Sequence, residues 1–169
     1  QADSKGVAAF GVYGCNIITA VTAQNSQAVT DVLAMPAAQI RSQWLALEHE
    51  YRPDIIKLGM LANAVVVDEV ISRLAAMEKV PVVCDPVLIA TNGGSLMESS
   101  QSYHKLLPYV DIITPNEEEF ATLFDIRCAT PEALAASALA VSKQYGIDLV
   151  ITDGESRLNP NMASDCCVI

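Results

Sequence analysis

Most apolar runs in this sequence are followed by residues that could contact a metal ion, a phosphate or a small polar ligand. In chain order these residues are Gln24, Asn25, Gly59, Met60, Asp85, Asn116, Glu119, Thr152 and Asp153. Carboxylate oxygens suit Mg²⁺, which usually keeps several waters and is held partly through substrate phosphates. The residue types therefore indicate a magnesium–nucleotide enzyme, although each of them taken singly is also common at turns and strand ends.

The segment 111–120 carries the densest group of such side chains. Its order predicts a short buried strand that turns into a helix, with Thr114 as the N-cap. Glu117 follows Thr114 by three residues, so a capping box explains at least one of the three glutamates. Asn116 and Glu119 are also three residues apart and share a face of the first helical turn. The segment fits both helix capping and ligand binding.

Strands and helices that would position these residues alternate along the chain. Runs rich in β-branched residues predict strands at 16–22, 54–58, 80–84, 111–113 and 147–151. Apolar stripes at helical spacing predict helices near 3–10, 36–51, 63–74, 99–108 and 131–145. Asn63 and Thr130 are placed to begin two of these helices, and Gly146 to end one. The run 16–22 is typical of a strand buried on both faces.

This alternation predicts an α/β fold with a central, mostly parallel sheet and helices on both faces. Right-handed crossovers bring the carboxyl ends of parallel strands to one edge of such a sheet, where ligands bind. We therefore expect the candidate ligand-binding residues to converge on one crevice.

The composition excludes several classes of protein. The chain has 169 residues, 51% of them hydrophobic and only 18% charged, which is typical of one globular domain. Its net charge of −10 argues against a nucleic-acid or anionic-membrane partner. The five cysteines form no Cys-x-x-Cys pair, so neither a disulfide framework nor a zinc site is expected. No long apolar run and no signal peptide is present, and a cytoplasmic location is the simplest expectation.

Several familiar catalytic motifs are absent from the sequence. It contains no P-loop, no Gly-x-Gly-x-x-Gly after a strand and no Gly-x-Ser-x-Gly. The two histidines, His49 and His104, fall on predicted helices with polar neighbours and are expected at the surface. These absences argue against a P-loop kinase, a Rossmann dehydrogenase and a serine hydrolase.

Several segments, in order along most of the chain, resemble the hydroxymethylpyrimidine/phosphomethylpyrimidine kinases of thiamine biosynthesis. They are Gln1-Ala2-Asp3, Tyr13-Gly14-Cys15, Thr22-Ala23-Gln24-Asn25, Lys57-Leu58-Gly59-Met60-Leu61, Asp85-Pro86-Val87 and Thr114-Pro115-Asn116-Glu117-Glu118-Glu119. The resemblance implies one domain over residues 1–169, with the three-layer fold of the ribokinase-like superfamily, and a homodimer. It further implies phosphorylation of 4-amino-5-hydroxymethyl-2-methylpyrimidine, and then of its monophosphate, with ATP and Mg²⁺.

The resemblance also implies roles for individual residues. Asp3 and Gln24 would hydrogen-bond the pyrimidine, and a Gln amide suits an aminopyrimidine because it offers both a donor and an acceptor. Met60 and Val87 would wall the ring. The family's Asn-x-x-Glu element, which organises Mg²⁺ and the phosphates, corresponds to Asn116 and Glu119. Asp85 would lie near the same metal or phosphates, so Asp85 and Glu119 are the implied metal residues, and Thr152 would lie towards the nucleotide.

The sequence departs from the family pattern in several places. The family carries a strand and a glycine-rich loop before the position of Gln1, and a Gly-Thr-Gly-Cys anion hole after that of Ile169. The chain is therefore expected to be incomplete at both ends, and its catalytic residue to lie in the anion-hole region. Thr91 replaces a frequent Lys, and Asp153-Gly154 replaces a Gly pair, which adds negative charge near the expected nucleotide site.

Three alternatives to this kinase remain open from the sequence. A pyridoxal or pyridoxine kinase of the same superfamily is the nearest enzyme. A homologue that binds the pyrimidine without phosphorylating it would also fit, given the departures from the family pattern. A sugar kinase of the same fold is disfavoured because no segment reads as the additional β lid that such enzymes usually carry.

Overall fold

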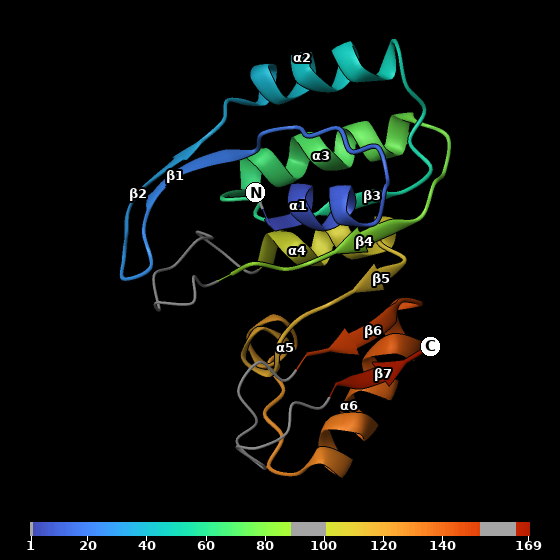
Figure 1. The fold of residues 1–169 in the computed structure, drawn as a ribbon. Helices are drawn as coiled ribbons and strands as arrows, with labels where there is room; N and C mark the ends of the chain where they lie inside the picture. The colour runs from blue at the N-terminus through green and yellow to red at the C-terminus, as the bar shows by residue number, and fades with distance from the viewer. Residues whose placement is uncertain (1, 89–100, 153–164) are drawn as a thin grey trace.

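A central five-stranded sheet organises the structure (Figure 1). The computed structural model describes residues 2–88, 101–152 and 165–169. In spatial order the strands are β3 (Ile56–Leu58), β4 (Val82–Cys84), β5 (Ile112–Ile113), β6 (Asp148–Ile151) and β7 (Cys166–Val168). β3 to β6 pair in parallel, and β7 runs antiparallel to β6. The predicted α/β fold with a mostly parallel sheet is confirmed.

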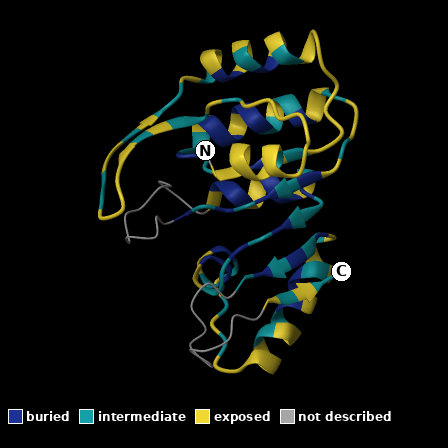
Figure 2. Ribbon diagram, viewed as in Figure 1, coloured by how far each residue is buried: buried dark blue, intermediate teal, exposed yellow. Residues whose placement is uncertain are grey.

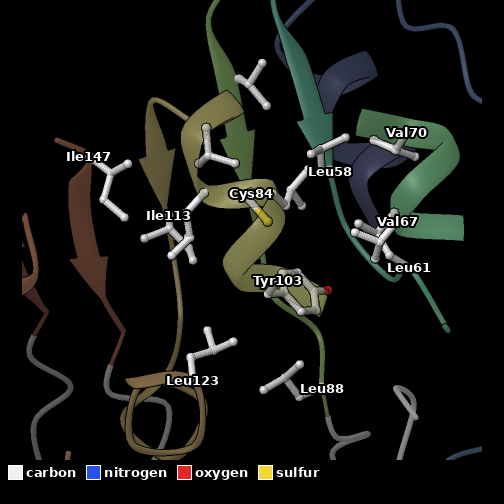
Figure 3. Close-up of a cluster of buried hydrophobic side chains, with 14 of the residues drawn as sticks. Leu58, Leu61, Val67, Val70, Cys84, Leu88, Tyr103, Ile113, Leu123 and Ile147 are labelled. Atoms are coloured by element: carbon white, nitrogen blue, oxygen red, sulfur yellow. The ribbon is translucent and has the colours of Figure 1, made fainter. Parts of the chain in front are cut away.

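The helices that link the parallel strands pack on one face of this sheet. They are α3 (Ala64–Ala76), α4 (Gln101–Leu106) with the 3-10 turn η1 (Leu107–Tyr109), α5 (Glu117–Phe124) and α6 (Pro131–Tyr145). The strand order advances in one direction from β3 to β6, and right-handed crossovers then leave every linking helix on the same side. Leu58, Cys84, Ile113 and Leu149 align across the sheet towards these helices and are at most 6% exposed. Figure 3 shows part of this core.

Helix α1 (Ala2–Ala9) lies over the opposite face of the sheet. Successive residues of a strand point to opposite faces, so Lys57 points away from the core that Leu58 enters. The Lys57 ammonium bonds Asp3 of α1, which places this helix over the β3 end of the sheet. Helices therefore lie on both faces, as predicted. Of the helices in the described ranges, none is long and apolar enough to cross a membrane.

The helix ends follow the predicted capping chemistry in three cases. The Asn63 side chain accepts a hydrogen bond from Val66 N at 3.0 Å at the start of α3. Thr130 Oγ1 accepts one from Ala133 N at 3.2 Å at the start of α6. Gly146 ends α6 with φ at +67°, a left-handed conformation that glycine adopts without a steric cost.

The segment 16–22 does not form the strand that its β-branched residues predict. The strand there, β1 (Ala20–Gln24), pairs only with the antiparallel β2 (Val29–Ala34), in a two-stranded sheet apart from the central one. Val21 and Leu33, which pair across this hairpin, are 51% and 61% exposed. Figure 2 shows the hairpin largely in the colours of exposed and intermediate residues. The prediction of a strand buried on both faces was wrong, because these residues pair with the next segment instead of entering the sheet.

Asn25 closes the hairpin between β1 and β2. Its Oδ1 accepts hydrogen bonds from Gln27 N at 2.8 Å and Ala28 N at 2.9 Å, an Asx-type turn. The hairpin is a small sheet that projects from the main body (Figure 1).

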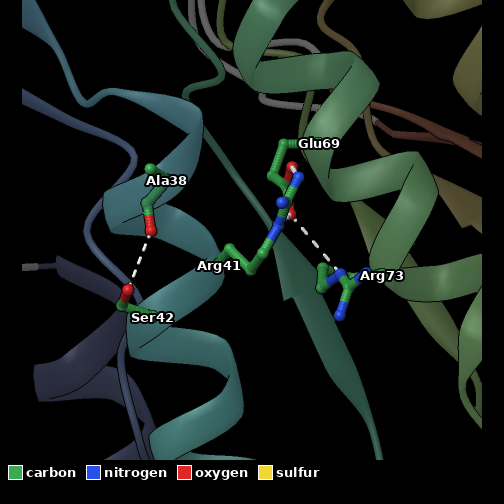
Figure 4. Close-up of polar contacts among 5 residues, drawn as sticks. All are labelled: Ala38, Arg41, Ser42, Glu69 and Arg73. Carbon is green, nitrogen blue, oxygen red and sulfur yellow. Dashed lines mark hydrogen bonds and ion pairs between the residues drawn. The ribbon is translucent and has the colours of Figure 1, made fainter.

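A buried carboxylate joins α2 (Ala37–Glu48) to α3 (Figure 4). Glu69 is 5% exposed, and its two oxygens accept hydrogen bonds from Arg41 Nε at 3.0 Å and Arg41 Nη2 at 2.6 Å. Arg73 adds an ion pair from one turn further along α3, with Nε 3.4 Å from Glu69 Oε1. The hydrogen bonds from Arg41 lower the pKa of Glu69 against the opposing effect of burial. The carboxylate therefore stays ionised and holds α2 on α3.

Candidate functional site

The carboxyl ends of the parallel strands are tied together just beyond the sheet. Asp85 N donates to Leu58 O at 2.8 Å, so the chain after β4 stays bonded to the end of β3. Thr152 N donates to Pro115 O at 2.9 Å, and Asn116 and Thr152 form a parallel β-bridge beyond β5 and β6. The residues that follow neighbouring strands therefore lie side by side. This confirms the predicted convergence for Asp85, Asn116 and Thr152.

A lysine joins two of the candidate carboxylates at this edge. The ammonium of Lys57, in β3, bonds Asp3 Oδ1 of α1 and lies 3.1 Å from Asp85 Oδ2. Partial burial works to lower the pKa of Lys57, but the hydrogen bonds to both carboxylates outweigh it and raise that pKa above its ordinary value. Lys57 is thus a fixed positive charge between two carboxylates that come from distant parts of the chain.

The start of α5 differs in detail from its prediction. The helix begins at Glu117, and its N-cap is Asn116 instead of Thr114. Asn116 Oδ1 accepts a hydrogen bond from Glu119 N at 2.8 Å, and Glu119 Oε2 accepts one from Asn116 N at 3.0 Å. This is a reciprocal capping box, two residues later than expected. Thr114 was the wrong cap because Thr114 and Pro115 still belong to the extended chain that leaves β5.

The capping box constrains what Glu119 can do at the site. Glu119 is 7% exposed, and its second oxygen, Oε1, accepts a long hydrogen bond of 3.4 Å from Leu88 N. Burial raises the pKa of Glu119, while the hydrogen bonds from Asn116 N and Leu88 N oppose that rise. Glu119 therefore ties α5 to the chain that leaves β4, next to Asp85.

The residues expected to contact the pyrimidine ring lie in different surroundings. Met60 and Val87 are half-buried and follow the ends of β3 and β4. Met60 O accepts a 2.6 Å hydrogen bond from Thr19 Oγ1, which ties the base of the hairpin to this edge. Gln24, in contrast, is exposed at the far end of β1, and its Oε1 accepts a hydrogen bond from Thr22 at 3.5 Å.

Gln24 was placed wrongly as a residue at the end of a central strand. No hydrogen bond within the described ranges joins it to Asp3, Met60 or Val87. The expectations for Thr91 and for Asp153-Gly154 concern residues outside the described ranges.

A groove of about 290 Å³ lies at the opposite, amino-terminal edge of the sheet. Its walls include Leu74, Tyr109 and Tyr145, and its charged residues are Glu78, Lys79 and Asp111. Asp85, Asn116 and Thr152 lie at the other edge, where ligands bind in open α/β sheets. We therefore assign the candidate site to the carboxyl edge.

Comparison with known proteins identifies the family. The sequence model of the family described as phosphomethylpyrimidine kinase matches residues 1–168. This chain belongs to the phosphomethylpyrimidine kinase family. A hydroxymethylpyrimidine/phosphomethylpyrimidine kinase from Haemophilus influenzae is 36% identical over 99% of this chain and 62% of its own length. The chain thus spans about three fifths of that relative, and it covers 51% of a relative of the same description from Escherichia coli.

The structural comparisons agree with this family. A phosphomethylpyrimidine kinase from Clostridium difficile superposes with a TM-score of 0.84 at 28% identity, covering 99% of this chain and 72% of the other. A pyridoxal kinase from Staphylococcus aureus, in complex with AMP-PCP, superposes with a TM-score of 0.79 at 24% identity and covers 97% of this chain and 60% of the other. The second likeness shows only that the fold is shared.

Lys57 is the residue at this edge to which the sequence alone assigned no role. It occurs in a motif of the family, and the composition of the strand alone already indicates that this lysine needs a partner. Lys57 is the one charged residue between Ile55 and Met60, in a run that otherwise reads as a buried strand. Charged side chains are seldom buried unless they are paired, so a lone lysine in a strand indicates a partner across the fold. The identity of that partner, Asp3, depends on how α1 folds back over the sheet.

The side chains at this edge fit a magnesium ion held mainly through waters and phosphates. Asp85 has a 35% exposed side chain and one oxygen, Oδ1, outside its ion pair with Lys57. Both oxygens of Glu119 already accept backbone hydrogen bonds, so it suits an indirect contact through water. The described residues contain no group of three acidic, histidine or cysteine side chains placed to hold a metal. Mg²⁺ typically needs only one or two carboxylates in addition to substrate phosphates.

Proposed function

We propose that the chain is part of a kinase that transfers phosphate from ATP to 4-amino-5-hydroxymethyl-2-methylpyrimidine and then to its monophosphate. The observation that carries the proposal is that motif residues from distant parts of the chain meet at one sheet edge. Asp3, Lys57 and Asp85 form one ion-pair cluster, and Asn116 bridges Thr152. The family match over residues 1–168 supports the reading of these residues as a kinase site.

In this proposal Asp3 accepts a hydrogen bond from the exocyclic amine of the pyrimidine. Met60 and Val87, half-buried at the ends of β3 and β4, contact the faces of the ring. Gln24 would bind the ring only after the hairpin closes over the edge, because it lies exposed on β1. Such closure would also exclude water from the reacting phosphate, which is the usual role of a closing lid.

Asp85, Asn116, Glu119 and Thr152 would serve the phosphates and the metal. Mg²⁺, when bound, would neutralise charge on the phosphates and hold them in line with the hydroxymethyl group. Asp85 would supply the direct carboxylate ligand, and Glu119 would orient a metal-bound water. Asn116 and Thr152 would donate hydrogen bonds to phosphate oxygens at the edge that their bridge defines.

The proposed metal role of Glu119 can be tested separately from its role in the capping box. Glutamine also serves at this position of a capping box, so Glu119→Gln should keep the bond from Asn116 N. Its NH₂ group cannot accept the long bond from Leu88 N, so a stability cost of about 1 kcal/mol is expected, which is measured separately from activity. The variant should require more Mg²⁺ for half-maximal turnover, or turn over more slowly. An unchanged Mg²⁺ dependence in a stably folded variant would refute the proposed metal role.

The activity itself is tested by product mass spectrometry on the full-length protein with Mg-ATP. One reaction contains the hydroxymethylpyrimidine and the other contains pyridoxal. A phosphorylated pyrimidine is the expected product. Phosphorylated pyridoxal alone would assign the protein to vitamin B6 chemistry, and no product with retained pyrimidine binding would indicate a non-catalytic homologue.

A homodimer and a cytoplasmic location are part of the same proposal. The exposed apolar side chains of Val21 and Leu33 on the hairpin support self-association, because such residues lower the free energy when a partner covers them. Sedimentation at several protein concentrations tests the dimer. A monomer at all concentrations would contradict it.

A further inference from the structure

Lys57 bonds one oxygen of each of two carboxylates, Asp3 and Asp85. Asp3 uses Oδ1 for the ammonium, and Asp85 uses Oδ2. No hydrogen bond in the described ranges engages the other oxygen of either group. Each carboxylate therefore keeps one oxygen for a ligand while the lysine fixes its orientation.

The second oxygen of Asp3 lies over Gly59. A Cβ atom added at Gly59 would lie 3.8 Å from Asp3 Oδ2, which is ordinary van der Waals contact. Asp3 Oδ2 is thus held close to the backbone that leaves β3, directly before Met60. The exocyclic amine of a pyrimidine that lies against Met60 is then placed to donate a hydrogen bond to Asp3 Oδ2.

Without the ammonium, two features would move Asp3. Asp3 and Asp85 would face each other as like charges, and the side chain of Asp3, which is 53% exposed, would turn towards solvent. Helix α1, which has no buried residues, offers little other packing to hold it in place. The position of Asp3 therefore depends on Lys57 more than on its own helix.

We infer that Lys57 is a positioning residue that sets the affinity for the aminopyrimidine by orienting Asp3. The inference rests on the proposed function, which makes Asp3 a pyrimidine ligand. A purely structural lysine would pin α1 to the sheet, and its loss would change stability without a specific effect on the pyrimidine. The two roles therefore predict different ligand dependence.

The test is calorimetric titration of the hydroxymethylpyrimidine, and separately of Mg-ATP, into the full-length protein. Lys57→Met should weaken pyrimidine binding about tenfold or more, as expected for one misplaced charge-assisted hydrogen bond. Mg-ATP binding should change as well, because Lys57 also holds Asp85, so the pyrimidine affinity in the two Asp3 backgrounds is the deciding measurement. Lys57→Arg should restore most of the affinity, because a guanidinium can also bridge two carboxylates. The same Lys57→Met change in an Asp3→Asn background should have an effect of about twofold or less, because the lysine acts through that aspartate.

Lys105→Met is the matched control, because Lys105 pairs with Asp68 at 3.2 Å on the helical layer. Its pyrimidine affinity should equal that of the wild type. Equal pyrimidine affinity of the wild type and Lys57→Met would overturn the inference while leaving the proposed function intact. Equal losses in the wild-type and Asp3→Asn backgrounds would also overturn it. A folded wild type that binds no pyrimidine would overturn the proposed function and, with it, this role of Lys57.

Discussion

Tyr103 provides a quantitative test of the packing beneath the candidate site. Its side chain is 0% exposed, and its hydroxyl is buried with no hydrogen-bond partner among the described residues. The ring lies in the core shown in Figure 3, together with Cys84 and Leu88. Burial raises the pKa of Tyr103, so the hydroxyl keeps its proton and remains an unsatisfied donor.

We predict that Tyr103→Phe stabilises the folded protein. A buried polar group without a partner costs about 1–3 kcal/mol relative to its hydration in the unfolded chain. Removal of the oxygen leaves a void of about one atom, which costs a few tenths of a kcal/mol at roughly 24 cal/mol per Å³. The net expectation is a gain of about 1 kcal/mol, or a rise in Tm of about 2–4 °C for a chain of this size. Urea unfolding followed by circular dichroism would measure it as a higher midpoint with an unchanged slope.

Tyr145→Phe is the matched control for this measurement. Its hydroxyl lies 3.4 Å from His104 Nδ1 at a half-buried position, so its removal should change stability by no more than a few tenths of a kcal/mol in either direction. Destabilisation of Tyr103→Phe by 1 kcal/mol, when about 1 kcal/mol of stabilisation is expected, would refute the reasoning. It would mean that the hydroxyl is hydrogen-bonded in the folded protein.

Three further predictions concern other parts of the structure. Glu69→Gln should cost about 1–2 kcal/mol near neutral pH, because it weakens the charge-assisted bonds from Arg41. The pKa of Glu69 is lowered from 4.5 in the folded state, so the stabilisation by the ionised carboxylate is complete above pH 4.5 and is lost as the pH falls through the folded pKa. If urea unfolding showed the same loss of stability for Glu69→Gln at pH 2 as at neutral pH, the prediction would be contradicted. Asn116→Ala should lower the free energy of unfolding by about 1 kcal/mol, because it removes the helix cap. Asn116→Asp keeps the cap but should weaken ATP binding in calorimetry, because its carboxylate repels the phosphates. Unchanged ATP affinity would argue against a phosphate contact. Gly59→Ala should fold normally by circular dichroism but bind the pyrimidine more weakly, because the new methyl group would cover Asp3 Oδ2; equal affinity would place the ligand elsewhere.

The parts of the fold that depend on neighbouring residues were predictable from the sequence. The caps at Asn63 and Thr130 follow from side chains that bond backbone groups three residues away. The ends of β3 to β6 follow from apolar runs that stop at polar or glycine residues, and a parallel sheet then gathers these ends at one edge. Local chemistry and one topological rule were sufficient for these features.

The features that were mispredicted or missed depend on distant partners. The run 16–22 has the composition of a buried strand, but whether a strand enters a sheet or pairs with its neighbour is decided by the competition among all strands. Glu69 lies in an apolar stripe, and its burial is possible because Arg41, on another helix, reaches it. Lys57 likewise depends on Asp3, which is 54 residues earlier in the chain. Composition can indicate that such a charge needs a partner, but not which residue supplies it.

The capping box at α5 and a ligand site at the same residues do not exclude each other. The cap uses the oxygen of the Asn116 amide and leaves its NH₂ group, a donor that suits a phosphate oxygen. The cap also fixes the orientation of that NH₂ group, because the amide plane is held by Glu119 N. Glu119, in turn, is aligned by Asn116 N and Leu88 N beside the end of β4. The contacts that begin the helix therefore hold both side chains in the rigid positions that a phosphate and metal site requires.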